Sequence, residues 1–68
     1  MSNVDLSNDE DIMLRQIAKA GKFGHPVSAP DEIDYRIGLE LMAKKLVVKS
    51  QRYWYLTMRG AQQLGIED

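Results

Sequence analysis

The side chains best suited to binding chemistry in this 68-residue chain are cations and tyrosines that lie close together in its second half. Residues 41–59 carry five cations and no acid: Lys44, Lys45, Lys49, Arg52 and Arg59. Tyr53 and Tyr55 follow directly after the fourth cation. Cations bind phosphate oxygens, and exposed tyrosine rings can stack on bases or hydrogen-bond to phosphates. The segment therefore indicates a surface that could contact nucleic acid. A plainer reading stays open, in which the cations serve solubility and the tyrosines cover a helix or a partner subunit.

The distribution of charge is more informative than its sum. The net charge is −1, which argues against indiscriminate binding of polyanions. Residues 1–11 carry four acids and no base, residues 12–30 carry three cations and no acid, and residues 31–40 are acidic again. A local excess of cations in residues 41–59 can still form a positive patch on a nearly neutral protein.

Other chemistry finds little support in the residue types. The chain has no cysteine and a single histidine, His25, with no second strong metal ligand at a suitable spacing. We find no nucleophile with a histidine and an acid, no paired carboxylates in a cleft and no glycine-rich phosphate loop. We therefore expect no enzyme activity, no metal, no cofactor and no small-molecule substrate.

The apolar residues occur only in short runs, so we expect no membrane span. The acidic start of the chain does not read as a secretory signal. A soluble cytoplasmic protein is the expectation.

The cations and tyrosines are expected on a β-hairpin. The apolar run of residues 46–48, the polar break of residues 49–52 and the aromatic run of residues 53–56 have the pattern of two strands around a short turn. Alternation along the second strand places Trp54 in the core and leaves Tyr53 and Tyr55 at least partly exposed. Thr57 is a good N-cap for a last helix over residues 58–64.

The first helix is predicted over residues 8–20. Ser7 and Glu10 have the spacing of a capping box, apolar residues recur at helical spacing, and Gly21 suits the end. Residues 22–27 are rich in glycine and proline and predict a loop. We expect Phe23 and Val27 to fasten that loop to the core.

The middle of the chain leaves two alternatives open. A serine, a proline and an acid at residues 28–31 favour a short helix over residues 29–33, followed by a longer helix to residue 45. The two pieces could also form one helix. The expected inward stripe is Ile33, Ile37, Leu41, Met42 and Leu46. Gly38 suggests that another backbone approaches closely there.

This order of elements, over about residues 8–65, resembles compact bacterial members of the winged helix-turn-helix superfamily. Residues 42–47 (MAKKLV) are similar to the end of the family's third helix, and Lys45 stands where many members carry glycine. Residues 53–60 (YWYLTMRG) are similar to the wing strand and the turn after it, and residues 28–33 (SAPDEI) resemble the serine-capped second helix. The interval between Ser28 and Leu46 is shorter than in the family, which implies a compressed helix-turn-helix.

The resemblance implies an α+β, mostly α fold: a winged helix-turn-helix-like three-helix core, a two-stranded hairpin wing and a short C-terminal helix. We expect residues 1–6 to be a flexible leader and residues 7–66 a single domain. Three acids, Asp31, Glu32 and Asp34, stand at the start of the third helix and would repel phosphates.

The predicted function is a small DNA-binding regulator that contacts duplex DNA mainly through its basic wing. The predicted contact residues are Arg36, Lys44, Lys45, Lys49, Arg52, Tyr53 and Tyr55. The alternative is a winged-helix module for association with itself or with a partner protein, without DNA binding.

Overall fold

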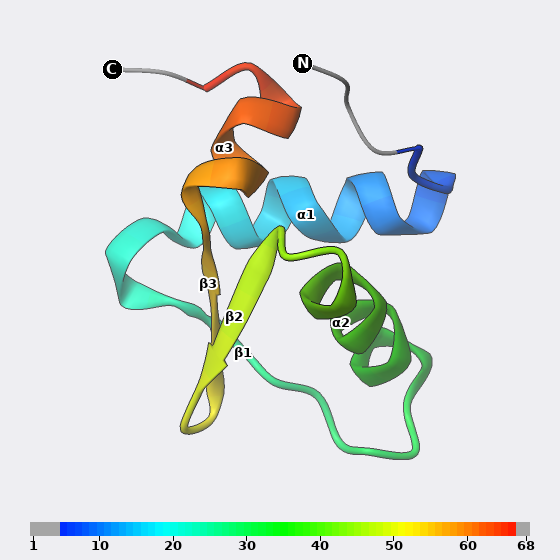
Figure 1. Cartoon of the computed structure of the whole chain (residues 1–68). Helices are drawn as coiled ribbons and strands as arrows, with labels where there is room; N and C mark the ends of the chain where they lie inside the picture. The colour runs from blue at the N-terminus through cyan, green and yellow to red at the C-terminus, as the bar shows by residue number, and fades with distance from the viewer. Residues whose placement is uncertain (1–4, 67–68) are drawn as a thin grey trace.

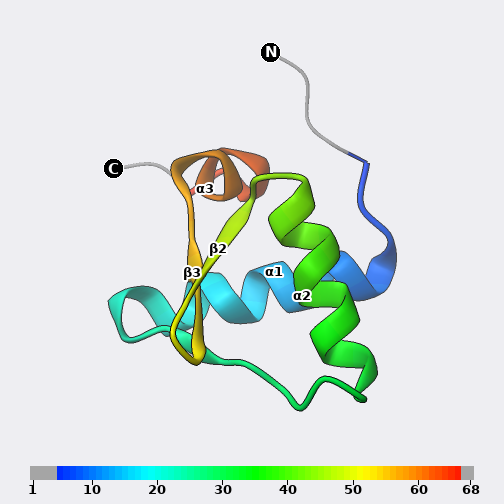
Figure 2. The same ribbon diagram turned by 60° about the horizontal axis from the view of Figure 1, so that its bottom comes forward.

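Residues 5–66, which the computed structural model describes, form three α-helices and a three-stranded antiparallel sheet (Figure 1). The elements in chain order are α1 (Asn8–Ala20), the 3-10 turn η1 (Gly21–Phe23), β1 (His25–Pro26), α2 (Ile33–Ala43), β2 (Val47–Ser50), β3 (Tyr53–Leu56) and α3 (Met58–Leu64). The chain is a small, mostly helical α+β domain. Helix α1 crosses the inner face of the sheet, and α2 packs beside β2 (Figure 2).

Helix α1 has the predicted bounds because its start is encoded locally. The Ser7 side chain accepts a hydrogen bond from the Glu10 backbone N–H at 3.2 Å, and Glu10 Oε1 accepts one from the Ser7 N–H at 2.9 Å. This reciprocal pair is the predicted capping box. The helix ends at Gly21, whose φ is 60°. Of the expected leader, residues 1–4 lie outside the described residues, while Leu6 packs against the core.

The hairpin is confirmed. Strands β2 and β3 pair antiparallel with Ser50 opposite Tyr53, which leaves Gln51 and Arg52 as a two-residue turn. Gln51 has a φ of 59°, as the first residue of a type II′ turn requires. The Trp54 side chain is 1% exposed, as expected for a core residue.

A third strand was not predicted. Strand β1 pairs with β3 on the side away from β2, with His25 opposite Trp54, and the Val27 N–H donates to the Arg52 carbonyl at 2.9 Å. The segment was predicted to be a loop because glycine and proline dominate it. A two-residue edge strand tolerates them, since it needs few ladder hydrogen bonds.

The short helix expected over residues 29–33 is wrong. A single turn takes its place, closed by a hydrogen bond from the Glu32 N–H to the Ala29 carbonyl at 2.9 Å, and one helix begins at Ile33. Residues 29–32 are all exposed, so a helix there would bury no apolar side chains and would not be stabilised by packing.

The end of α2 forms a Schellman motif centred on Lys45. The Leu46 N–H donates to the Leu41 carbonyl at 3.1 Å, and the Lys45 N–H donates to the Met42 carbonyl at 2.9 Å. Lys45 has a φ of 67°, in the left-handed region that favours glycine. Leu41 and Leu46 are both fully buried beside the motif.

The start of α3 is hydrogen-bonded to this same junction. The Thr57 N–H donates to the Leu46 carbonyl at 3.1 Å, and Thr57 Oγ1 donates to the Lys45 carbonyl at 2.8 Å. The same hydroxyl accepts from the Gly60 N–H at 3.0 Å as the helix N-cap. One side chain thus connects the first residues of α3 to the end of α2.

The core lies between α1, α2 and the sheet. Its buried apolar residues are Met13, Leu14, Ile17, Ile37, Leu41, Leu46, Val47 and Trp54. At Gly38 the close neighbour is the Trp54 indole and not a backbone, since a Cβ built on Gly38 would lie 2.5 Å from a ring carbon. Three expected core contacts are wrong: Phe23 is 78% exposed, Ile33 is 67% exposed and Met42 is 37% exposed. Val27 does pack against the core.

Candidate nucleic-acid interface

The hairpin turn, the loop after β1 and the start of α2 surround an open hollow of about 260 Å³, which we call the tip hollow. Its lining residues are Val27, Ser28, Pro30, Tyr35, Lys49, Gln51 and Arg52. None of these described residues is acidic. Within residues 5–66, Lys49 and Arg52 have no ion-pair partner, and both are exposed. The tip hollow is therefore a positively charged concave surface.

Lys49 and the two tyrosines lie on opposite faces of the hairpin. Lys49 pairs with Trp54 across the strands, so its side chain is on the face that turns toward the helices. Tyr53 and Tyr55 alternate to the other face. The Tyr55 ring packs on Gly24, where an added Cβ would lie 2.9 Å from the ring, and it is half-buried. Tyr55 thus covers the turn before β1, whereas Tyr53 stays 40% exposed.

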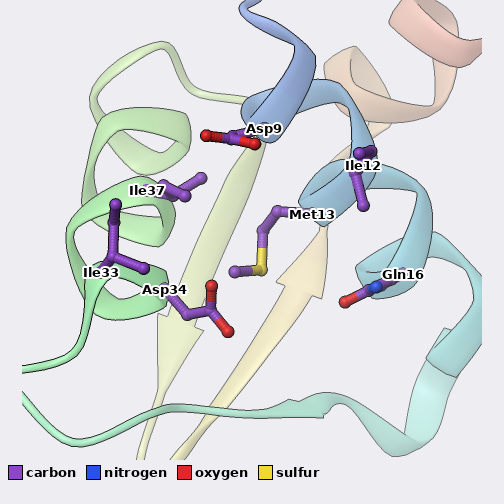
Figure 3. Close-up of a pocket in the computed structure, with 7 residues that line it drawn as sticks. All are labelled: Asp9, Ile12, Met13, Gln16, Ile33, Asp34 and Ile37. Atoms are coloured by element: carbon purple, nitrogen blue, oxygen red, sulfur yellow. The ribbon is translucent and has the colours of Figure 1, made fainter.

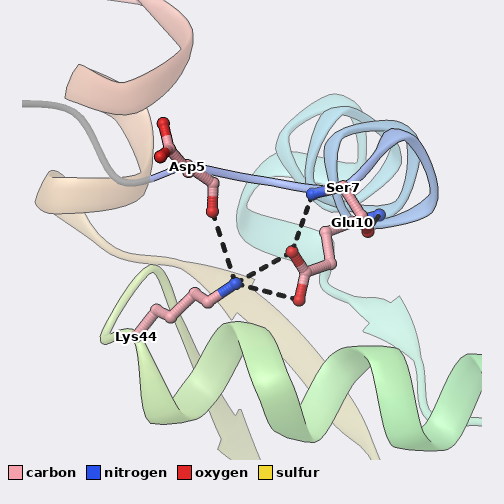
Figure 4. A network of polar contacts seen from close by, with 4 residues as sticks. All are labelled: Asp5, Ser7, Glu10 and Lys44. Carbon is pink, nitrogen blue, oxygen red and sulfur yellow. Dashed lines mark hydrogen bonds and ion pairs between the residues drawn. The ribbon is translucent and has the colours of Figure 1, made fainter.

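Lys44 has a structural contact in place of a free ammonium group. Its Nζ lies 2.8 and 3.0 Å from the two carboxylate oxygens of Glu10 and 3.5 Å from the carbonyl oxygen of Asp5 (Figure 4). Glu10 is only 6% exposed. The Lys44 ammonium, and next the Ser7 N–H, lower the pKa of Glu10 from its usual 4.5 to about 2, against the effect of burial. The pair joins the start of α1 to the end of α2, so the Lys44 ammonium group is engaged within the fold.

Lys45 and Arg36 lie at the two ends of α2. Lys45 follows the last turn of that helix, at the other end of β2 from the hairpin turn, and its side chain is exposed away from the tip hollow. Arg36 is exposed in the first half of α2, next to Tyr35. Of the seven predicted contact residues, the structure brings Lys49 and Arg52 together at the tip hollow, and Arg36 does not line it.

Tyr35 and Ser28 belong to the tip hollow but were not predicted. A signal for Tyr35 was present in its spacing: it lies three residues before Gly38, so both are on the same side of α2. Since Gly38 contacts the Trp54 indole, that side faces the hairpin.

The acids at the start of α2 do not all face the tip hollow. Asp34 lines a different hollow, between α1 and α2, together with Asp9 (Figure 3). Asp31 and Glu32 are exposed in the turn before α2. Helix α2 therefore has a basic neighbourhood on its hairpin side and an acidic one on its α1 side.

Within residues 5–66, no group of three or more histidine, cysteine or acidic side chains is arranged to hold a metal ion. In the same range no helix has the length and hydropathy that crossing a bilayer demands.

No family model, no curated protein and no solved structure matches this chain.

Proposed function

We propose that this protein is a small, non-enzymatic winged-helix protein that binds duplex DNA through its hairpin. The observation that carries the proposal is the tip hollow, where two hairpin cations that have no ion-pair partner within residues 5–66 meet the first half of a helix, with no acid among the described lining residues. In this reading the hairpin is the wing, and α2 is the helix that approaches the major groove.

The order of elements supports the winged-helix interpretation. A capped helix, a second helix, a hairpin and a short helix follow one another, and the hairpin packs through Trp54 against the helices. The helix before α2 is reduced to the turn at residues 30–32, which makes this a compressed version of the fold. With that turn in place, α2 presents Tyr35 to the tip hollow, and Arg36 is exposed on the same half of the helix.

The expected contacts are to phosphates and not to base edges. Lys49, Arg52 and Arg36 are flexible cations on an exposed surface, and such side chains set the position of a protein on the duplex without reading its sequence. Three phosphate contacts give a slope of about −2.7 in a plot of log K against log salt. The affinity should then fall about fortyfold between about 50 and about 200 mM salt.

The decisive experiment is fluorescence anisotropy of a labelled mixed-sequence duplex, titrated with protein at these two salt concentrations. The double variant Lys49→Ala/Arg52→Ala should bind more weakly and should lose only about fourfold affinity over the same salt range, because about one phosphate contact remains. The matched control is Lys19→Ala/Arg59→Ala, which removes the same charge from exposed positions on α1 and α3.

The control should keep the affinity and salt slope of the natural chain. Absence of binding by the natural chain at micromolar concentration and low salt, or equal losses in the two double variants, would refute DNA binding at the hairpin. The protein-association alternative would then be favoured.

A further inference from the structure

The first halves of α1 and α2 enclose a hollow of about 180 Å³ on the side of α2 that faces away from the hairpin; we call it the acidic groove (Figure 3). Met13 and Ile37 form its buried floor. Ile12, 46% exposed, and Ile33, 67% exposed, line its rim. The two isoleucines give the acidic groove an apolar rim that an occupant would cover.

Two carboxylates accompany these isoleucines. Asp9 and Asp34 line the acidic groove, and within residues 5–66 neither has an ion-pair partner. Each lies in the first turn of its helix, where the helix dipole favours an acid. That role explains the acids but not the exposed isoleucines next to them. Together they form a site for a side chain with an apolar stem and a positive end, which is the chemistry of arginine and lysine.

We propose that the hairpin tip of a second copy of this chain docks in the acidic groove. The tip carries Lys49, near the end of β2, and Arg52, in the two-residue turn, both exposed and unpaired within the described residues. The two cations of the tip, Arg52 and Lys49, pair with the carboxylates of Asp9 and Asp34, and the aliphatic stem of Arg52 covers the apolar rim. The charge complementarity between these two surfaces is the argument for this occupant.

Lys49 and Arg52 line the tip hollow of their own copy and neither lines its acidic groove, so a copy does not fill its own groove. The contact is therefore intermolecular. Two copies can exchange tips in a closed pair, or further copies can add head to tail. A docked tip cannot also bind phosphates, so DNA and the second copy compete for Lys49 and Arg52.

Sedimentation velocity at about 50 mM salt, from about 10 µM to about 1 mM protein, tests the proposal through charge reversal. The groove variant Asp9→Lys/Asp34→Lys and the tip variant Lys49→Glu/Arg52→Glu should each stay monomeric, because each then opposes like charges. An equimolar mixture of the two should associate again, because the reversed tip of one fits the reversed groove of the other. The natural chain should associate in a way that about 500 mM salt or excess duplex DNA reverses.

A milder variant is needed because the lysines introduced at positions 9 and 34 could destabilise the starts of α1 and α2. Ile33→Ser changes an exposed rim residue and should weaken self-association about tenfold, whereas Met58→Ser, at an 80% exposed position on α3, should not. A natural chain that stays monomeric at about 1 mM, or an Ile33→Ser variant that associates like Met58→Ser, overturns the proposal. Both results leave the DNA proposal untouched, because the natural chain and both serine variants keep Lys49 and Arg52.

Discussion

Replacing Glu10 by glutamine should remove the contribution of this carboxylate to the pH dependence of the protein's stability. The Lys44 ammonium, and next the Ser7 N–H, lower the pKa of Glu10 from 4.5 to about 2. Each pKa unit is worth about 1.4 kcal/mol, so these contacts together stabilise the charged carboxylate by about 3 kcal/mol. Glutamine keeps the size of the side chain and can still accept the hydrogen bond from the Ser7 N–H. The substitution therefore isolates the charge interaction with Lys44.

The direction of the pH dependence follows from the lowered pKa. Above pH 4.5 the carboxylate is ionised in the folded and unfolded states, and its contribution is fully present. As the pH falls from 4.5 toward 2, the unfolded state binds a proton that the folded state resists, and the contribution is lost. The Glu10→Gln variant should be less stable than the natural chain by up to about 3 kcal/mol at pH 7 and nearly equal to it at about pH 2.

Urea unfolding followed by circular dichroism at pH 7, 4, 3 and 2 measures this difference directly. Asp11→Asn is the matched control, because Asp11 pairs with Arg15 at 2.9 Å on the same helix but with side chains 39% and 64% exposed. An exposed pair of this kind contributes less than about 1 kcal/mol. Natural chain and Glu10→Gln curves that stay parallel from pH 7 to pH 2 would refute the assignment of the buried pair.

Substitutions to or from glycine at two positions give further predictions. Lys45→Gly should raise the free energy of unfolding by about 1 kcal/mol and Tm by about 4–8 °C, because glycine adopts the left-handed conformation at no steric cost. The same change at Lys19, inside α1, should destabilise by about 1 kcal/mol, and a loss of stability at both positions would contradict the Schellman geometry. Gly38→Ala should destabilise by about 1–3 kcal/mol and shift the fluorescence of Trp54, since the new methyl group would meet the indole at 2.5 Å. A more stable Gly38→Ala variant with unchanged emission would show that the indole lies elsewhere.

The parts of the fold that were predicted correctly depend on short-range patterns. Ser7 and Glu10 are three residues apart and determine the start of α1 by themselves. Alternation around Trp54 was enough to assign the faces of β3. Both patterns work because the interacting groups are neighbours in the sequence.

The errors arose where distant residues decide the structure. Ser28 and Pro30 suit a helix start, but a turn forms because that segment has no apolar face to bury. Strand β1 forms because its backbone pairs with β3, about thirty residues later in the chain. Local residue preferences cannot predict a pairing between such distant segments.

The candidate site was predicted only in part for the same reason. Lys44 looked like a surface cation at a helix end, and only its approach to Glu10, 34 residues earlier, makes it structural. Alternation did separate Tyr53 from the core, but the position of the cations relative to the tyrosines depends on the pairing of Lys49 with Trp54.

The Thr57 hydroxyl has a mechanical consequence. It holds the base of the hairpin at the point where β2 leaves α2 and β3 enters α3, so both legs of the ribbon are anchored to the same helix end. Together with the Trp54 indole packed against Gly38, this anchor opposes tilting of the hairpin relative to α2. A ligand in the tip hollow meets a preformed shape, and little of its binding energy is spent on ordering the protein.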